Sequence, residues 1–243
     1  MQVAAGVHRL SRGICNFYLI EDAGKLVLVD AGAPGDWSLL VQTIGGLGRR
    51  LSDLDAVLLT HAHADHTGFA ERARTTAQAR VLIHEADAAQ ARGAKPGKND
   101  GMLRSHLLHP ELYRTTFSLL RRGAYRIVPI RELSSFTDGA VLDVPGRPRV
   151  LHAPGHTPGT AALHFETPGV LLSGDALVTR NPLTGRVGPQ IMPAAFNRDT
   201  PEALASLTAL DSIAADTILP GHGEPWTEGA SEAVRLARAA GVS

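Results

Sequence analysis

Short apolar runs, bounded by glycine, proline or acidic turns, alternate along the chain with segments of helical periodicity. Apolar runs of four to eight residues are typical of strands, whereas apolar positions three and four residues apart indicate amphipathic helices. Trp37, Leu40 and Ile44 follow the helical spacing. The pattern predicts strands at residues 7–10, 15–20, 25–29, 56–60, 80–83, 150–152, 161–165, 170–173 and 217–219, and helices at residues 36–47, 69–74, 85–92, 110–122, 200–213 and 228–240.

The predicted strands fall into two groups, and helices follow each group. Two sheets packed between two layers of helices would bury the apolar faces of all these elements. The pattern alone does not fix the strand order. The chain has 243 residues, a normal size for one large α/β domain, so we expect a single domain spanning residues 1–243.

The amino-acid composition limits the kinds of molecule that the protein is expected to bind. Lys plus Arg and Asp plus Glu both number 24, so the formal net charge is zero, and no global charge favours nucleic acid or an anionic membrane. Cys15 is the single cysteine, so no internal disulfide can form and a metal site would use His and carboxylate ligands. Neither a signal peptide nor a membrane-spanning run is recognisable. We expect a cytoplasmic protein that acts on a small molecule.

Residues 92–131 differ from this balanced background. The segment holds nine Lys and Arg residues, and its only acidic residues are Asp100 and Glu111. We interpret it as a basic insertion or lid. Basic segments are usually solvated surface, but the excess here also supports the hypothesis that the substrate is anionic.

A dense group of metal-ligand residues follows the predicted strand at residues 56–60. Its sequence is His61-Ala62-His63-Ala64-Asp65-His66. In extended backbone, residues two apart point to the same side, so His61 and His63 can converge on one ion. Asp65 and His66 can point to a second position nearby. Imidazole and carboxylate are both ordinary zinc ligands, so the spacing indicates a metal site.

Three later segments end predicted strands in a similar way. His156 lies in Pro154-Gly155-His156-Thr157, Asp175 follows Ser173-Gly174, and His222 lies in Pro220-Gly221-His222-Gly223. Each segment alone is weak evidence. Together they place three further ligand-type side chains at strand ends, where a rigid scaffold can gather them.

These segments, with Val29-Asp30-Ala31-Gly32 before them, resemble in order the five motifs of the metallo-β-lactamase superfamily. The resemblance implies an αββα four-layer sandwich with metals at one edge of the paired sheets. It also implies that His61, His63 and His156 hold one metal ion, that Asp65, His66 and His222 hold the other, and that Asp175 bridges both. Asp30 would support the ligand loop from behind, as carboxylates often do for metal-bound imidazoles.

The expected chemistry follows from two adjacent divalent ions, which we expect to be zinc, with iron as an alternative. Two cations flanking one water lower its pKa, so that a bridging hydroxide exists near neutral pH and can attack an ester, thioester, lactone or similar carbonyl. Asp175 would hold both ions. We hypothesise that Asp65 also helps to move a proton to the leaving group.

Several branches of the superfamily remain open. The chain resembles the glyoxalase II branch, but only about twenty residues follow His222, so we expect no C-terminal glutathione-binding helical domain. Ala176-Leu177-Val178 follows Asp175, without the tyrosine common in lactonases at this position. The alternatives are a mononuclear iron enzyme resembling persulfide dioxygenases, a phosphodiesterase, and a metal-binding protein without catalysis.

Overall fold

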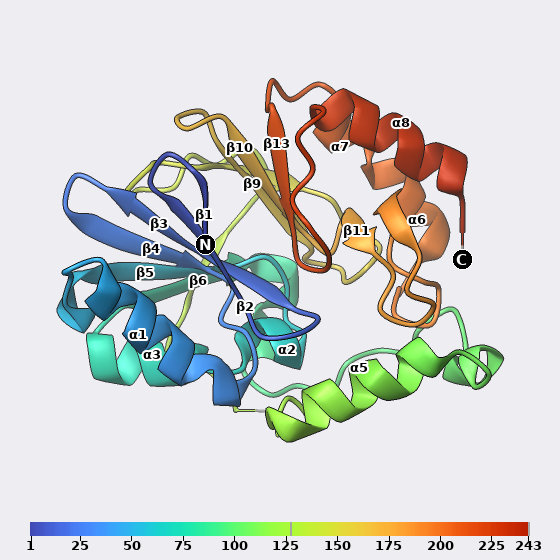
Figure 1. Cartoon of the computed structure of the whole chain (residues 1–243), viewed down its shortest axis with the longest axis horizontal. Coiled ribbons are helices and arrows are strands. Elements are labelled where there is room, and N and C mark those ends of the chain that lie inside the picture. The colour runs from blue at the N-terminus through green and yellow to red at the C-terminus, as the bar shows by residue number, and fades with distance from the viewer. Residues whose placement is uncertain (127, 243) are drawn as a thin grey trace.

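In the computed structural model, which describes residues 1–126 and 128–242, a larger and a smaller sheet lie face to face (Figure 1). The larger sheet has the order β1-β2-β3-β4-β5-β6-β7, and the smaller has the order β13-β10-β9-β8. A two-stranded ribbon pairs β11 with β12. The strands are β1 (Gln2–Ala4), β2 (Val7–Ser11), β3 (Asn16–Asp22), β4 (Lys25–Val29), β5 (Leu54–Leu59), β6 (Arg80–His84), β7 (Ser134–Phe136), β8 (Arg149–His152), β9 (Ala161–Phe165), β10 (Val170–Gly174), β11 (Val178–Arg180), β12 (Val187–Gln190) and β13 (Thr217–Pro220).

Helices cover the outer face of each sheet (Figure 1). The helices α1 and α3 pack on the larger sheet, whereas α6, α7 and α8 pack on the smaller one. The α-helices are α1 (Trp37–Gly46), α2 (Ala64–Thr67), α3 (Ala70–Ala77), α4 (Ala88–Ala91), α5 (Pro110–Arg121), α6 (Thr200–Ser206), α7 (Thr208–Asp211) and α8 (Ala230–Ala240). The fold is the expected αββα sandwich.

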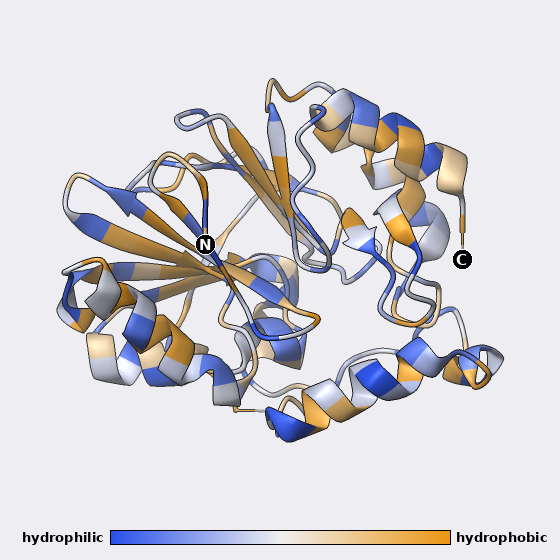
Figure 2. Ribbon diagram, viewed as in Figure 1, coloured by the Kyte–Doolittle hydropathy of each residue, from blue (hydrophilic) through white to orange (hydrophobic). Residues whose placement is uncertain are grey.

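Side-chain alternation along the strands builds these layers. On β4, Leu26 and Leu28 pack toward Leu40 and the other helix residues of the outer core, whereas Val27 and Val29 face the smaller sheet. Both sets are buried because β4 lies inside the sandwich, so the strand is apolar on both faces. Figure 2 shows the central strands as almost continuously hydrophobic, whereas the outer helices carry hydrophilic residues as well.

Most expected elements are present with bounds shifted by one or two residues, but three expectations were wrong. Residues 61–68, for which the pattern predicted neither strand nor helix, contain the helical turn α2, where the Thr67 N–H donates to the His63 carbonyl at 2.9 Å. The single helix expected at residues 200–213 is interrupted at Leu207 and forms α6 and α7. Residues 85–92 form a 3₁₀ turn followed by the short α4.

The short strands β1, β7, β11 and β12 were not predicted. Each has three or four residues, which is too short for a two-residue periodicity to be recognised, and each depends on pairing with a neighbour.

Parallel strands gather the ends of both sheets at one edge. In the larger sheet β4, β5 and β6 run parallel. In the smaller sheet β10 and β13 run parallel, and β8 shares their direction because β9 is antiparallel to both β8 and β10. Within each sheet, the segments that follow these strands therefore leave at the carboxyl ends of the strands. Binding sites of α/β proteins are typically built at such ends.

The described part of the basic segment, residues 92–126 and 128–131, which we call the covering segment, lies across this edge. Its main helix, α5, runs below both sheets in Figure 1. Glu111 on α5 pairs with Arg180 at 2.8 Å, and the Arg122 carbonyl accepts a hydrogen bond from the Gly35 N–H at 2.9 Å. Leu112 packs on Leu183 in a small separate apolar cluster. Within the described residues, no helix is both long and apolar enough to cross a membrane.

Candidate metal centre

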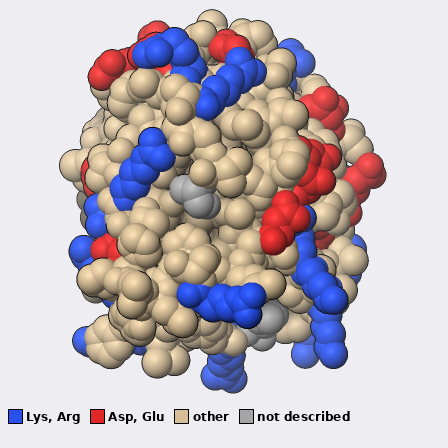
Figure 3. Space-filling model, turned by 90° about the vertical axis from the view of Figure 1, so that its right-hand side faces the viewer, with Lys and Arg blue, Asp and Glu red and all other residues tan. Residues whose placement is uncertain are grey.

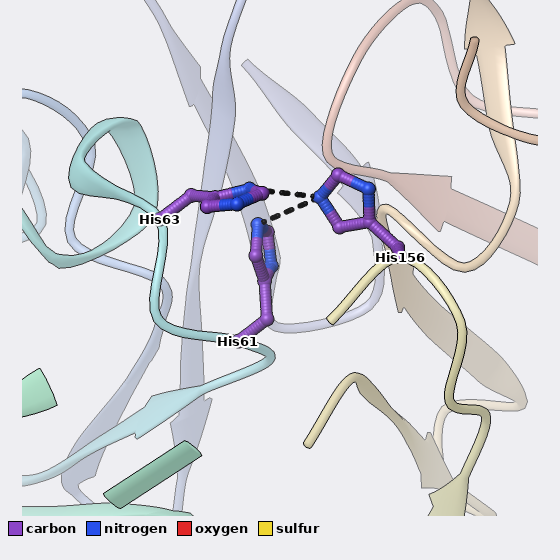
Figure 4. Close-up of side chains that lie close together, drawn as sticks. All are labelled: His61, His63 and His156. Carbon is purple, nitrogen blue, oxygen red and sulfur yellow. Dashed lines mark hydrogen bonds between the residues drawn. The ribbon is translucent and has the colours of Figure 1, made fainter. Parts of the chain in front are cut away.

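Three histidines from two separate loops converge at the sheet edge (Figure 4). The Nε2 atom of His156 lies 2.9 Å from Nδ1 of His63 and 3.3 Å from Nε2 of His61. His61 follows β5, His63 precedes α2, and His156 follows β8. His61 and His156 are buried, and His63 is partly exposed. The structure therefore brings together the first expected group of ligands.

A second group lies next to the first. Nε2 of His66 is 3.8 Å and Nε2 of His222 is 3.7 Å from Oδ2 of Asp65. Asp65 and His66 belong to α2, whereas His222 follows β13. These are the three residues expected at the second position.

Asp175, which follows β10, lies between the two groups. Its Oδ2 atom is 3.4 Å from Nε2 of His156 and 3.3 Å from Nε2 of His222, and its Oδ1 atom is 3.6 Å from Nε2 of His66. Oδ1 is buried and has no hydrogen-bond partner. Gly221 permits this approach, because a Cβ atom there would lie 2.2 Å from Oδ1 of Asp175. The carboxylate thus faces both groups of histidines.

Hydrogen bonds behind the rings determine which nitrogen of each histidine carries the proton. Nδ1 of His222 is 2.7 Å from the Ile14 carbonyl, which can only accept, so this Nδ1 donates. Nδ1 of His66 donates to Asp30 at 2.8 Å. Asp30 therefore supports His66, a residue of the ligand loop that the resemblance implied it would support. With Nδ1 protonated, a neutral ring presents the lone pair of Nε2 to the centre.

The same argument applies to the first group. Nδ1 of His61 contacts the hydroxyl of Thr60 at 3.0 Å, and that hydroxyl in turn donates to Asp30, so it accepts from His61. Nδ1 of His156 donates to the side-chain oxygen of Asn197 at 3.2 Å. The Nε2 atoms of His61 and His156 therefore both carry lone pairs, and two lone pairs 3.3 Å apart attract a cation rather than each other.

The charges of the site favour bound cations in two ways. Burial lowers the pKa of His61 well below its usual value and lowers the pKa of His156 to about 3, so both rings are neutral ligands at physiological pH. Burial also acts to lower the pKa of His222, but the Asp175 carboxylate outweighs it and raises that pKa. Burial alone would raise the pKa of Asp175, yet His222 and His66 hold it well below its usual value, so Asp175 is an anion.

The donor set fits divalent metal ions. Two groups of His and Asp ligand atoms, His61 with His63 and His156, and His61 with His66 and Asp175, each lie within 4.8 Å of one another. Neutral imidazole and carboxylate suit zinc and also suit iron. The unpartnered Oδ1 atom of Asp175 and the inward lone pairs of His61 and His156 are the features that a bound cation would satisfy.

Asp87 braces the first group and was not identified from the sequence. Its buried carboxylate accepts three hydrogen bonds of 2.8 Å, from the Ala62 N–H, the Thr157 hydroxyl and the Gly159 N–H. Ala62 lies between His61 and His63, and Thr157 follows His156. One carboxylate therefore joins both loops of the first group. The available signal was the position of Asp87 just after β6, at the edge where the other strand ends gather.

Cys15 borders the second group and was also not predicted to lie there. Its Sγ atom is 3.8 Å from Nε2 of His66 and donates to the Asp65 carbonyl at 2.9 Å. Burial raises the pKa of the Cys15 thiol to about 12, so the group is neutral at physiological pH. With Asp65 and His66 it forms a third group whose ligand atoms lie close together.

A cavity of about 210 Å³ opens onto the centre. His63, Asp65, His156, Asp175 and His222 form its floor, and residues of the covering segment lie on another wall. The side chain of Asp65 is 19% exposed, compared with 2% for Asp175. Asp65 is therefore the carboxylate that solvent and a substrate can reach.

The order of the motifs and the geometry of the edge agree with a comparison against known families. Residues 10–222 match the model of the metallo-beta-lactamase superfamily. The chain belongs to this superfamily. Its members are mostly hydrolases that bind divalent metals.

Relatives match over nearly the whole chain. Probable metallo-hydrolase YflN of Bacillus subtilis is 28% identical over 241 residues, which cover 93% of this chain and 87% of the relative. The human acyl-coenzyme A thioesterase MBLAC2 is 28% identical, with 91% of this chain and 77% of the relative covered. The crystal structure of a metallo-beta-lactamase family protein from Thermus thermophilus is 29% identical, with a TM-score of 0.72 over 98% of this chain and 80% of that chain.

Proposed function

We propose that this protein is a dinuclear metal-dependent hydrolase that cleaves an ester, thioester, lactone or similar carbonyl substrate. The observation that carries the proposal is the convergence of seven ligand side chains, with the Asp175 carboxylate between two groups of histidines. In this proposal His61, His63 and His156 hold one ion, and Asp65, His66 and His222 hold the other. The ions would be zinc.

The chain's own residues would perform the remaining tasks. When bound, the two ions would supply an activated water and stabilise negative charge on the carbonyl oxygen. Asp30, Thr60 and Asn197 keep the histidine rings oriented through their Nδ1 atoms. This support holds the ligand nitrogens in place without reorganisation during turnover.

Asp65 would move the proton. Oδ2 of Asp65 faces Nε2 of His66 and His222, and the side chain is partly exposed to the cavity. Its carboxylate can accept a proton from the attacking water and pass it to the leaving oxygen or sulfur, so that the products are a carboxylic acid and an alcohol or thiol. No protein nucleophile is needed.

A thioester is the substrate type that we favour. The support is the resemblance to the glyoxalase II branch and the similarity to the human acyl-coenzyme A thioesterase across most of the chain. The identity is 28%, and one fold can host many different substrates, so the substrate must be measured.

The test is a hydrolysis panel with the zinc-loaded protein. Acetyl, butanoyl and hexanoyl thioesters, the corresponding phenyl esters, γ-lactones, a phosphodiester and a cephalosporin are each assayed for turnover. We expect turnover of a carbonyl substrate that stops when the metal is removed with a chelator and returns on adding zinc. A protein that binds one iron and consumes oxygen with a persulfide, or that binds two zinc ions and hydrolyses nothing in the panel, would contradict the proposal.

A further inference from the structure

The cavity over the metal centre has an apolar wall in addition to its floor of ligands. Three separate segments build this wall: the connection between β2 and β3, the end of α5 with the turn after it, and residues 182–196. They contribute Ile14, Leu119, Ala124, Pro182, Met192 and Phe196. Because these segments are far apart in sequence, the wall exists only in the folded chain.

Two polar side chains of the lining, Thr115 and Asn99, have hydrogen-bond partners within the protein, whereas Tyr125, which also lines the cavity, is 59% exposed. The Thr115 hydroxyl donates to the Pro182 carbonyl at 2.6 Å. The amide nitrogen of Asn99 donates to the Ala195 carbonyl at 2.7 Å, and its oxygen accepts from Arg198 at 2.6 Å. These bonds hold the two side chains in place, while the Thr115 oxygen and the second N–H of Asn99 can each form a further hydrogen bond.

No Lys or Arg lies among the residues that line the cavity in the described part of the chain. Arg114 and Arg121 on α5 point to solvent, and Arg122 lies 3.6 Å from the buried Asp36 carboxylate. On the face drawn in Figure 3, Lys and Arg side chains are spread over the surface rather than gathered in one patch. Apart from Tyr125, the ionisable groups that line the cavity are the carboxylates and histidines of the metal centre.

We propose that this cavity binds the acyl part of the substrate, and that this acyl group is short, apolar and uncharged. The inference rests on the proposed hydrolase function, because the metal centre would hold the reacting carbonyl and the apolar wall would surround the chain attached to it. A volume of about 210 Å³ is below the roughly 300–1,000 Å³ of pockets for drug-sized ligands, which favours a short chain. An anionic portion of the substrate would then belong to the leaving group, outside this cavity.

The direct test measures binding rather than turnover. Straight-chain carboxylates from acetate to decanoate are titrated into the zinc-loaded protein by calorimetry, with the carboxylate taking the position of the product at the metals. We expect affinity to rise about fourfold for each added methylene, which corresponds to about 0.8 kcal/mol, and to stop rising when the cavity is full. An affinity independent of chain length would overturn the proposal.

A ligand with a charged end tests whether the cavity lacks a lysine or arginine side chain. Hexanoate and hexanedioate have the same length, but the second ends in a further carboxylate. We expect hexanedioate to bind at least about tenfold more weakly, since no lysine or arginine would compensate for the buried charge. Equal or tighter binding of hexanedioate would overturn the uncharged character of the acyl group.

Two neighbouring leucines on α5 give a matched pair of variants. Leu119 lines the cavity, whereas Leu120 is 61% exposed and lies outside it. We expect Leu119→Ala to weaken hexanoate binding by about three- to tenfold through lost apolar contact, and Leu120→Ala to change it by less than about twofold. Equal effects of the two substitutions would overturn the assignment of the wall.

These results separate the two proposals. If the protein binds carboxylates with the expected length dependence but hydrolyses nothing, the acyl cavity is supported and the hydrolase function is refuted. If the protein hydrolyses panel substrates but neither binding nor turnover depends on chain length, the hydrolase function is supported and the acyl cavity is refuted.

Discussion

The metal-ligand loops and the covering segment face each other across one cavity, but they are held in very different ways. The loops leave strands inside a sandwich whose apolar side chains are buried on both faces of the sheets. Except for the partly exposed His63, their histidine rings are buried and hydrogen-bonded from behind. On α5, by contrast, Tyr113 and Phe117 are each 59% exposed.

This difference separates two tasks of the site. Ligand atoms must hold a fixed geometry, and the rigid sheet edge with its hydrogen-bonded rings provides it. The substrate wall needs only shape and apolar surface, which a more loosely attached helix can supply and can vary without disturbing the metal ligands.

Removal of the shared carboxylate should have the largest effect. Asp175→Ala leaves the histidines in place but removes the group that faces both sets of ligand nitrogens. We expect loss of at least one metal ion and a fall in turnover of about 10³-fold or more, since several kcal/mol of transition-state stabilisation depends on the ions. Asp143→Ala, at an exposed carboxylate, is the control. Metal content and turnover close to those of the unmodified protein would refute the bridging role.

Asp87→Asn should weaken the first group of ligands selectively. The amide cannot accept all three hydrogen bonds that the carboxylate accepts, so at least one of the two loops loses a hydrogen bond. Changes behind metal ligands typically cost about 10–100-fold in metal affinity, and we expect a loss in this range for one ion of the two. The measurement is zinc titration against a competing chelator.

Glu85→Gln is the matched control for Asp87→Asn, because Glu85 lies on the same loop and is exposed. We expect this variant to bind both ions as the unmodified protein does. If Asp87→Asn weakened the binding of both ions equally, the carboxylate would stabilise the fold in general rather than the first group of ligands in particular.

Hydrogen exchange should distinguish the covering helix from a sheet-packed helix of similar length. On α1, Trp37, Leu40 and Ile44 are buried against the larger sheet, whereas on α5 the buried residues are Leu112 and Thr115. We expect the central amides of α5 to exchange at least about tenfold faster than those of α1, because local opening exposes less apolar surface. Equal protection of the two helices would contradict the looser attachment of α5.

Cys15→Ser should have the smallest effect. The thiol is neutral, with its pKa raised to about 12 by burial, and it donates to the Asp65 carbonyl, which a serine hydroxyl can also do. We expect metal content to be unchanged and turnover to fall by less than about threefold, with a stability loss within the usual range of about 0.5–3 kcal/mol. Loss of metal from this variant would show that the thiol is itself a ligand.

The sequence predicted which side chains converge at the sheet edge because many of the relevant signals are local. His61 to His66 lie within six residues after a buried strand, and the later ligands His156, Asp175 and His222 follow strands in glycine-containing turns. The order of these motifs along the chain led to the αββα sandwich. Strand ends, glycine turns and ligand-type side chains all leave recognisable short-range patterns.

Contacts between distant segments were not predictable in the same way. Asp87 reaches Ala62 and Thr157 only after three strands have come together, and Cys15 meets His66 across 51 positions. The substrate wall likewise combines Ile14, Leu119 and Met192. The basic composition of residues 92–131 suggested an anionic substrate, yet composition does not show which side chains of a helix turn inward. That expectation stays a prediction for the leaving group.

The most direct test of the central claim is metal stoichiometry, measured by elemental analysis after zinc titration of the protein and of two single variants. We predict two zinc ions per chain, with one ion lost in His156→Ala and the other lost in His222→Ala, as the two groups of ligands require. A single ion in the unmodified protein, or a variant pair that loses the same ion, would contradict a centre with two positions joined by Asp175.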